Sequence, residues 1–190
     1  TCWVLYRNYT RWEILEKKFL PEMNKDNKNP KVWSAACSTG EEPYTLSMVL
    51  SNFLPLKEIK IKATDIDSNV ITRAKLATYQ ERSLQEVPTG VKNKYFTKQD
   101  GLYKVREEIK KTVIYKRLNL LSDPFEPGHD LIVCRNVLIY FTEEAKEQLY
   151  HKFSNSLKKG GILFVGSTEQ IFQPAKYGFE VVDTFFYRKV

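Results

Sequence analysis

One stretch near the start of the sequence, residues 31 to 46 (KVWSAACSTGEEPYTL), constrains the fold of this chain more than any other. An apolar run over 32–37 breaks at 38–40, and a helical pattern resumes behind Pro43. This order predicts a buried strand, a tight turn and the start of a helix. A ligand could lie on such a turn.

Capping chemistry around the turn gives a simpler explanation for the same residues. Ser38 with Glu41, and Thr39 with Glu42, have the spacing of a capping box, which stabilises the first turn of a helix. The single glycine, Gly40, falls far short of the G-x-G-x-x-G pattern of dinucleotide-binding loops. Taken alone, the turn fits an ordinary capped connection as well as it fits a binding site.

Strand and helix patterns alternate along the chain. After the first strand we expect a helix over about 42–54, a strand over 59–65 and a helix over 68–77. Such alternation is typical of a parallel, doubly wound α/β sheet. Further along, the patterns predict a strand at 130–134, a helix at 143–158 capped by Thr142, and strands at 162–166 and 179–188.

Two segments interrupt this alternation. Trp12, Leu15 and Phe19 recur at helical spacing, and we expect that helix to stop at Pro21. Residues 101–117 contain two strand-like pieces joined by a charged turn. We interpret them as a small antiparallel β insert whose second piece returns to the main sheet.

Composition bounds the class of protein. A length of 190 residues suits one domain, taken as residues 1–190, and 42% hydrophobic with 28% charged residues is ordinary for a globular chain. The three cysteines have no C-x-x-C spacing, so we expect no metal and a reducing cytoplasm. No apolar stretch approaches the roughly 18 residues of a membrane span. The net charge of +7 comes from scattered lysines, which are typical of a solvated surface, and we expect no nucleic-acid partner.

Four candidate groups follow strands that should lie side by side. They are the turn at 38–42, Asp65, Asn119 with Leu120, and Arg135 with Asn136. In open α/β sheets, ligands bind beyond the carboxyl ends of the strands, where the strand order reverses. Each residue alone also has a structural explanation, such as a cap or a turn, so their joint placement carries the argument.

The chemistry of these groups suits an adenosyl ligand. A carboxylate at Asp65 could accept both hydroxyls of a ribose, and Asn119 could donate to and accept from an adenine edge beside the apolar Leu120. Glu42 lies near a positive helix end that would favour an anion, yet it could equally face an ammonium or a sulfonium. Because the sequence has no glycine loop for a pyrophosphate, S-adenosylmethionine fits this set of residues.

Five motifs, taken in order, resemble the CheR family, the protein-glutamate O-methyltransferases of bacterial chemotaxis receptors. These are WSAACSTGEEPY (33–44), ATDID (63–67), NLL (119–121), CRNVLIYF (134–141) and LKKGGILFVGSTE (157–169). The resemblance extends from about Tyr6 to the C-terminus, and the STGEEPY and CRNVLIYF strings are its specific parts.

The resemblance implies a class I S-adenosylmethionine-dependent methyltransferase fold, with a mostly parallel seven-stranded sheet and the small antiparallel insert at about 101–117. It implies cofactor contacts at Glu42, Asp65, Asn119, Leu120, Arg135 and Asn136, to which we add Ala36, Ser38 and Gly40 of the first turn. Arg7 and Tyr140 align with the family's substrate-side residues and are the catalytic candidates. The implied partners are the cytoplasmic helices of chemotaxis receptors, and we expect a cytoplasmic monomer.

Three departures from the family limit this comparison. The family usually has a helical N-terminal domain that contacts the receptor, and the sequence begins abruptly without it, so we expect a fragment whose receptor recognition stays open. Thr1 and Trp3 lie in a segment, TCWVLYR, that does not align with the family's polar and aromatic motif. The loop TKQDG (97–101) is short, so we expect weak or absent docking of a receptor's C-terminal peptide.

Two rival functions stay open from the sequence. The same fold could bind S-adenosylmethionine as a sensor or scaffold that has lost catalysis, which the irregular N-terminal segment favours. A methyltransferase acting on nucleic acid would also suit a basic chain, but the N/D-P-P-Y type of motif expected for base amino groups is absent from the sequence. Steeply salt-dependent binding to RNA or DNA would distinguish that class.

Overall fold

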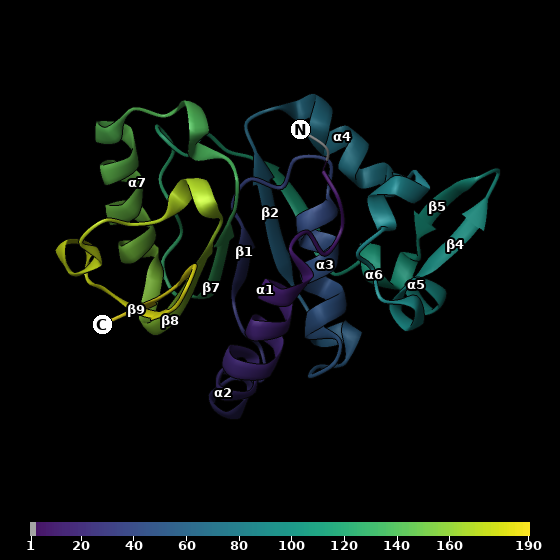
Figure 1. The fold of residues 1–190 in the computed structure, drawn as a ribbon, viewed down its shortest axis with the longest axis horizontal. Coiled ribbons are helices and arrows are strands. Elements are labelled where there is room, and N and C mark those ends of the chain that lie inside the picture. The colour runs from purple at the N-terminus through teal and green to yellow at the C-terminus, as the bar shows by residue number, and fades with distance from the viewer. Residues whose placement is uncertain (1–2) are drawn as a thin grey trace.

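A computed structural model describes residues 3–190, apart from the side chain of Asp26, so Thr1 and Cys2 lie outside the described residues. Its centre is a seven-stranded sheet in the order β6-β2-β1-β7-β8-β10-β9 (Figure 1). The strands are β1 (Val32–Ser34), β2 (Ile61–Asp65), β6 (Val113–Arg117), β7 (His129–Cys134), β8 (Leu157–Val165), β9 (Phe179–Asp183) and β10 (Phe186–Lys189). Neighbours from β6 to β8 pair in parallel, and β10 is antiparallel to both of its neighbours. The predicted mostly parallel α/β sheet is confirmed.

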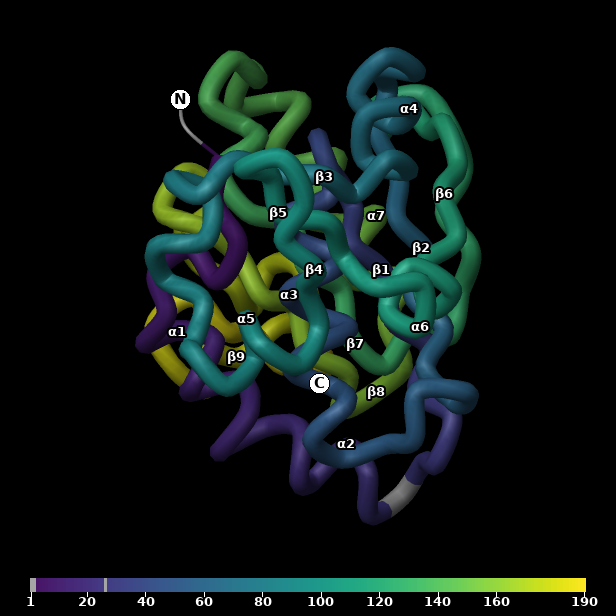
Figure 2. Tube along the Cα trace, turned by 90° about the vertical axis from the view of Figure 1, so that its right-hand side faces the viewer, coloured from purple at the N-terminus to yellow at the C-terminus, as the bar shows by residue number. Residues whose placement is uncertain are grey.

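Helices cover both faces of this sheet, because successive residues of a strand point to opposite sides. On one face, α1 (Tyr9–Ile14), α3 (Glu41–Leu50) and α4 (Ser68–Leu76) pack in a core that includes Val32 and Val133. On the other face, α7 (Glu143–Ser156) packs in a core that includes Trp33 and Ile132. Figure 2 shows the same arrangement from the side. The sheet therefore has both faces buried, as a parallel sheet requires.

Most of the predicted elements are present with small shifts in their ends. Thr142 caps α7 as predicted, since its hydroxyl accepts the N–H of Ala145 at 3.1 Å. The single strand predicted over 179–188 is instead the hairpin β9–β10, because the chain turns at Phe185, which has φ 71. No helix within residues 3–190 combines the length and the apolar character needed to cross a lipid bilayer.

The antiparallel insert lies earlier in the chain than predicted. A separate three-stranded sheet, at the right of Figure 1, consists of β3 (Thr78–Tyr79), β5 (Leu102–Val105) and β4 (Phe96–Gln99), with the short helices α5 (Thr89–Tyr95) and α6 (Glu107–Lys110) beside it in the chain. The predicted bounds, 101–117, are therefore corrected, since β3 and β4 precede residue 101. The predicted return to the main sheet is confirmed, because β6 at 113–117 pairs in parallel with β2. Only Phe96 of the four residues of β4 is buried, so no alternating pattern marks that strand in the sequence.

The N-terminal helix continues past Pro21, contrary to the prediction. α1 leads into a π-helical turn, η1 (Leu15–Phe19), and then into α2 (Leu20–Asp26). Pro21 lies in the first turn of α2, where the missing N–H of proline is tolerated. The wider π turn has already interrupted the regular hydrogen-bond ladder at that point. Trp12 and Phe19 still face the core, as their spacing predicted.

Candidate functional site

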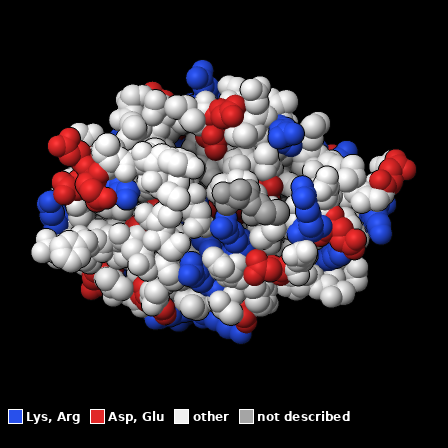
Figure 3. All heavy atoms as spheres, turned by 45° about the horizontal axis from the view of Figure 1, so that its top comes forward, with Lys and Arg blue, Asp and Glu red and all other residues white. Residues whose placement is uncertain are grey.

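The carboxyl ends of four neighbouring strands lie along one edge of the main sheet. β6, β2, β1 and β7 are parallel and adjacent, and Asn119, Asp65, Ser38 and Arg135 follow or end these strands in that order. The strand order reverses between β1 and β7, which is where ligands bind in open α/β sheets. Figure 3 brings this edge forward and shows basic side chains near the middle of the face. The four candidate groups thus share one edge.

The turn after β1 is shaped by its backbone rather than by the predicted capping boxes. Gly40 is the N-cap of α3 with φ 97, a conformation that suits glycine. A Cβ at Gly40 would lie 2.8 Å from the hydroxyl of Tyr79 and 2.9 Å from Cε2 of Tyr44, so a side chain has no room there. The hydroxyl of Thr39 donates to the carboxylate of Glu41 at 2.7 Å, and α3 has no side-chain cap. The capping-box prediction is therefore wrong.

Asp65, the last residue of β2, joins two segments of this edge. Its Oδ2 accepts the N–H of Ser38 at 2.9 Å, and its Oδ1 accepts the N–H of Asp67 at 3.0 Å. Ala36, two residues before Ser38, is 8% exposed. A carboxylate has about four lone-pair sites, so the half-buried Asp65 keeps capacity for further donors on both oxygens.

Glu42 places a second carboxyl group in the first turn of α3. The hydroxyl of Ser34 donates to its Oε1 at 2.7 Å. Burial raises the pKa of Glu42 to about 8, and the Ser34 hydrogen bond and the charge of Arg135 oppose that shift only in part. Glu42 is therefore mostly protonated at neutral pH, a state that a cation bound beside it would reverse.

Arg135 follows β7 and carries a buried guanidinium. The residue is 3% exposed, and the guanidinium carbon lies 5.5 Å from the ring centroid of Trp12 and 4.8 Å from that of Phe164. Its Nη1 donates to the backbone carbonyl of Arg7 at 3.0 Å. Burial lowers the pKa of Arg135 to about 10, so the group stays charged at neutral pH. A fixed positive charge thus lies at the end of β7.

Residues 3–8, here named the N-terminal strap, bring Arg7 to this edge. Tyr6 and Asn8, on either side of Arg7, have φ of 55 and 59, an uncommon conformation for residues other than glycine. The N–H of Tyr6 donates to the hydroxyl of Thr45 on α3 at 2.9 Å. Outliers of this kind persist where surrounding contacts hold them and are frequent at functional sites.

A small cavity lies between the N-terminal strap and the strand ends. Its volume is about 20 Å³, and its lining includes Arg7, Glu42, Arg135 and Asn136. Nη1 of Arg7 and both Nε and Nη2 of Arg135 are buried without a hydrogen-bond partner among the described residues. Because buried donors are normally paired, these nitrogen atoms fit a ligand that offers carboxylate or hydroxyl oxygens.

Asn119 and Leu120 extend the edge beyond β6. Oδ1 of Asn119 accepts the N–H of Leu121 at 3.0 Å, and Leu120 is 8% exposed. Ile66, which directly follows Asp65, is 53% exposed and offers an apolar surface on this edge. The sequence analysis did not consider Ile66, because its exposure becomes evident only in the structure.

Tyr140 lies apart from the cavity that Arg7 lines. It ends the 3-10 turn η4 (Leu138–Tyr140) and is 92% exposed, so it is not a core residue packed between apolar neighbours. The structure thus brings Arg7 together with Glu42, Arg135 and Asn136, and leaves Tyr140 outside the cavity lining.

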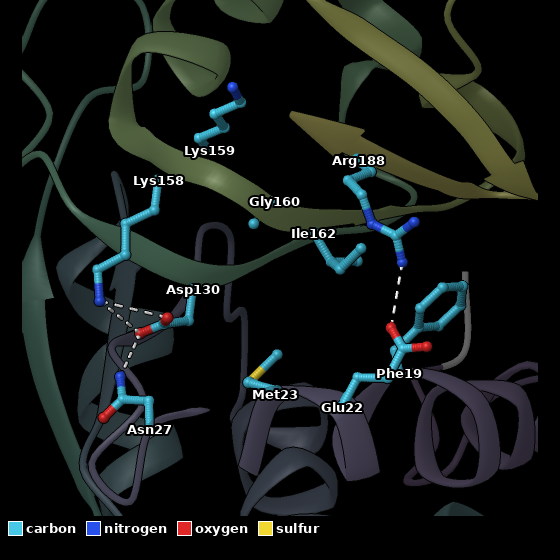
Figure 4. A pocket seen from close by; sticks show the side chains of 11 residues that line it. Phe19, Glu22, Met23, Asn27, Asp130, Lys158, Lys159, Gly160, Ile162 and Arg188 are labelled. Atoms are coloured by element: carbon cyan, nitrogen blue, oxygen red, sulfur yellow. Dashed lines mark hydrogen bonds and ion pairs between the residues drawn. The ribbon is translucent and has the colours of Figure 1, made fainter. Parts of the chain in front are cut away.

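A larger cavity lies at the opposite edge of the sheet, near the first residues of β7 and β8 (Figure 4). It measures about 540 Å³ and contains none of the predicted site residues. Four of its charged side chains form ion pairs, with Lys158 at 3.3 Å from Asp130 and Arg188 at 3.3 Å from Glu22. Ion pairs that satisfy each other leave little for a ligand, so size alone does not make this cavity the candidate site.

Solved structures of other proteins share the fold of this chain. A TehB-like S-adenosylmethionine-dependent methyltransferase from Corynebacterium glutamicum has a TM-score of 0.53 and 17% identity, with 96% of this chain and 94% of that chain covered. The segment 942–1257 of StiE O-MT has a TM-score of 0.55 and 13% identity, with 93% and 52% covered. The fold is that of the S-adenosylmethionine-dependent methyltransferases.

Sequence similarity narrows the class to one family. The family model described as CheR methyltransferase, SAM binding domain, matches residues 4–186. Proteins named chemotaxis protein methyltransferase from Listeria innocua and Listeria monocytogenes are each 43% identical over 185 residues, which cover 97% of this chain and 71% of theirs. One of the same name from Borreliella burgdorferi is 38% identical over 178 residues, covering 87% and 63%. The chain belongs to the CheR methyltransferase family and carries its S-adenosylmethionine-binding domain.

Proposed function

We propose that this chain catalyses S-adenosylmethionine-dependent methylation of glutamate side chains on the cytoplasmic helices of chemotaxis receptors. The observation that carries the proposal is the cavity at which Arg7, Glu42, Arg135 and Asn136 meet, on the same edge of the sheet as Asp65. The names of the relatives support the role in chemotaxis. In this proposal residues 1–190 form the catalytic domain, and the protein acts as a monomer in the cytoplasm.

The nucleoside end of the cofactor is assigned to the strand ends of β2 and β6. Asp65 accepts the ribose hydroxyls with the lone pairs that its two backbone contacts leave over. Asn119 contacts the adenine edge, with Leu120 and Ile66 as apolar neighbours. The backbone of Ala36, Ser38 and Gly40 lies along the same side of the ligand.

The methionine end of the cofactor is assigned to the cavity under the N-terminal strap. The unpaired nitrogen atoms of Arg135 suit its carboxylate, and Asn136 adds an amide on the same side. Glu42 faces the ammonium or the sulfonium, whose positive charge favours the ionised carboxylate. Because the cavity measures about 20 Å³, the strap or its side chains shift when the cofactor binds.

The proposed reaction requires the chain to position its substrate and does not require it to transfer a proton. Bound S-adenosylmethionine supplies an electrophilic methyl group on a sulfonium. The substrate glutamate, with an ordinary pKa of about 4.3, is ionised at neutral pH and needs no general base. Arg7, whose Nη1 has no hydrogen-bond partner among the described residues, would donate to one oxygen of that carboxylate and leave the other free to act as the nucleophile. Tyr140, exposed at the end of η4 and outside the cavity lining, is assigned to support the incoming carboxylate from the solvent side.

Transfer of labelled methyl groups tests the proposal directly. We expect the full chain to label glutamates of a receptor cytoplasmic fragment, as methyl esters that release methanol in alkali. S-adenosylhomocysteine binding without any transfer would reject the enzyme in favour of the sensor or scaffold. Label in RNA or DNA, with a steep dependence on salt, would reject it in favour of a nucleic-acid methyltransferase.

The raised pKa of Glu42 predicts how the stability of the protein and the binding of the cofactor depend on pH. Because its folded pKa of about 8 exceeds its ordinary value of 4.5, the folded protein binds more protons than the unfolded chain between these values. The stability that this group contributes is therefore lost as pH rises from about 4.5 to about 8. A bound cation lowers the pKa of Glu42, so cofactor binding near pH 7 should release up to one proton.

Calorimetry in two buffers with different ionisation enthalpies measures that proton. We expect S-adenosylmethionine to show a buffer-dependent heat with the wild-type chain and a buffer-independent heat with Glu42→Gln. Equal heats in both buffers with the wild type would mean that Glu42 does not face the positive end of the cofactor.

A further inference from the structure

Glu169 packs against the loop that follows β7 and does not line the cavity of the proposed site. It ends the 3-10 turn η5 (Ser167–Glu169) after β8 and is 1% exposed. Its Oε1 accepts the N–H of Val137 at 2.5 Å and the N–H of Leu138 at 3.2 Å. One carboxylate oxygen thus holds two successive backbone donors at the start of η4.

Gly166 fixes the same loop from a second point at the end of β8. A Cβ at this position would lie 2.8 Å from the backbone nitrogen and 2.8 Å from Oδ1 of Asn136. Asn136 itself has φ 60, so the chain reverses sharply between Arg135 and η4. The backbone of Asn136 therefore packs directly onto Gly166. The carboxylate of Glu169 accepts hydrogen bonds from the N–H groups of the next two residues.

The free-energy cost of burying the Glu169 carboxylate indicates that this residue has a role beyond packing. Its Oε2 is buried without a hydrogen-bond partner among the described residues. Leaving a buried carboxylate oxygen unpaired is unfavourable, and a neutral or apolar residue would avoid that cost. The negative charge also acts on the proposed site, because it helps to keep Arg135 charged and raises the pKa of Glu42.

We propose that Glu169 is a positioning residue for methyl transfer, holding the loop from Asn136 to Tyr140 in the shape that the substrate side of the site requires. This inference rests on the proposed function. Glu169 does not touch the reacting atoms, and it acts through the two N–H groups of Val137 and Leu138. The loop carries Asn136, assigned to the cofactor, and Tyr140, assigned to the substrate. A shift of the loop therefore changes the positions of both residues.

Two substitutions at Glu169 distinguish positioning from mere stability. Glu169→Ala should lower kcat/KM for the receptor fragment by about 10- to 100-fold, because misplacement by about 1 Å can cost that much. Glu169→Gln keeps a carbonyl oxygen that accepts the same two N–H groups, and should be at least about tenfold more active than Glu169→Ala. Glu143→Ala is the matched control, since that acid lies on α7 with an 88% exposed side chain.

Hydrogen exchange gives a readout that does not depend on activity. The amides of Val137 and Leu138 should exchange faster in Glu169→Ala than in wild type, while amides of β7 stay protected. If Glu169→Ala does not fold, Gly166→Ala displaces the same loop and should show the same loss of kcat/KM.

Two results would overturn the inference about Glu169. The first is wild-type kcat/KM and unchanged exchange at Val137 and Leu138 in Glu169→Ala. The second is equal impairment of Glu169→Ala and Glu169→Gln. Failure of the proposed function has a different signature, because the wild-type chain itself then transfers no methyl group, and hydrogen exchange still decides whether Glu169 holds the loop.

Discussion

Replacing Asp65 with alanine is expected to lower the affinity for S-adenosylhomocysteine by at least about 100-fold. Two hydrogen bonds from the ribose to a charged acceptor are lost, and such bonds contribute roughly 1.5–3 kcal/mol each. About 2.8 kcal/mol already corresponds to a 100-fold change in affinity. The substitution also releases the N–H groups of Ser38 and Asp67, which now fix the turn around the ligand. Isothermal titration calorimetry measures the change.

A neighbouring acid provides the matched control for Asp65. Asp67 accepts the N–H of Asn69 at 2.8 Å as the N-cap of α4 and has no place in the proposed site. Asp67→Ala should cost about 1 kcal/mol of stability and leave the affinity unchanged. Asp65→Asn keeps the shape of the side chain and isolates the effect of its charge. Wild-type affinity in Asp65→Ala would show that the cofactor site lies elsewhere.

The location of the site at one edge of the sheet could be predicted, because it depends only on which residues stand at the ends of the parallel strands. A recognisable polar residue ends or closely follows each of β2, β6 and β7, and the carboxyl ends of parallel neighbours meet at one edge by geometry alone. Asp65, Asn119 and Arg135 could therefore be assigned to one edge without any knowledge of tertiary contacts. The order β6-β2-β1-β7 agrees with that reasoning.

The contacts that hold the N-terminal strap and the loop after β7 could not be predicted, because they join segments far apart in the chain. Arg135 donates to the carbonyl of Arg7 across 128 positions, and Glu169 accepts from Val137 across 32. The sequence named Arg7 only through family resemblance and gave Glu169 no role. The backbone conformation of Tyr6 was equally hidden, since its positive φ has no signature in a residue type that rarely adopts the left-handed region.

Local rules failed where tertiary packing overrode them. A proline normally ends a helix, yet Pro21 lies within a continuous helical segment because a π turn precedes it. Serine and threonine before two glutamates normally cap a helix. Here the N–H of Ser38 instead bonds Asp65, and the hydroxyl of Thr39 bonds Glu41. At the turn after β1, one polar group thus bonds the end of β2 and the other bonds the side chain of the first residue of α3, and neither caps a backbone N–H of the helix.

Replacing Arg7 with alanine is expected to lower kcat/KM for the receptor fragment by about 10- to 100-fold. A hydrogen bond between charged groups contributes roughly 1.5–3 kcal/mol, and each 1.36 kcal/mol of barrier is tenfold in rate. The fold should survive, because Arg7 binds Trp12 and Arg135 through its backbone carbonyl, which alanine retains. Single-turnover kinetics with saturating cofactor separates this effect from cofactor binding.

Two further variants decide what the Arg7 side chain does. Arg7→Lys keeps the charge but loses the planar pair of donors, so an intermediate rate would identify carboxylate orientation as its role. Lys17→Ala is the control, since Lys17 lies in η1 of the same helical segment with a 75% exposed side chain and should leave the rate unchanged. Alanine at position 7 with a wild-type rate would remove Arg7 from the mechanism and leave the substrate carboxylate to be held from the side of Tyr140.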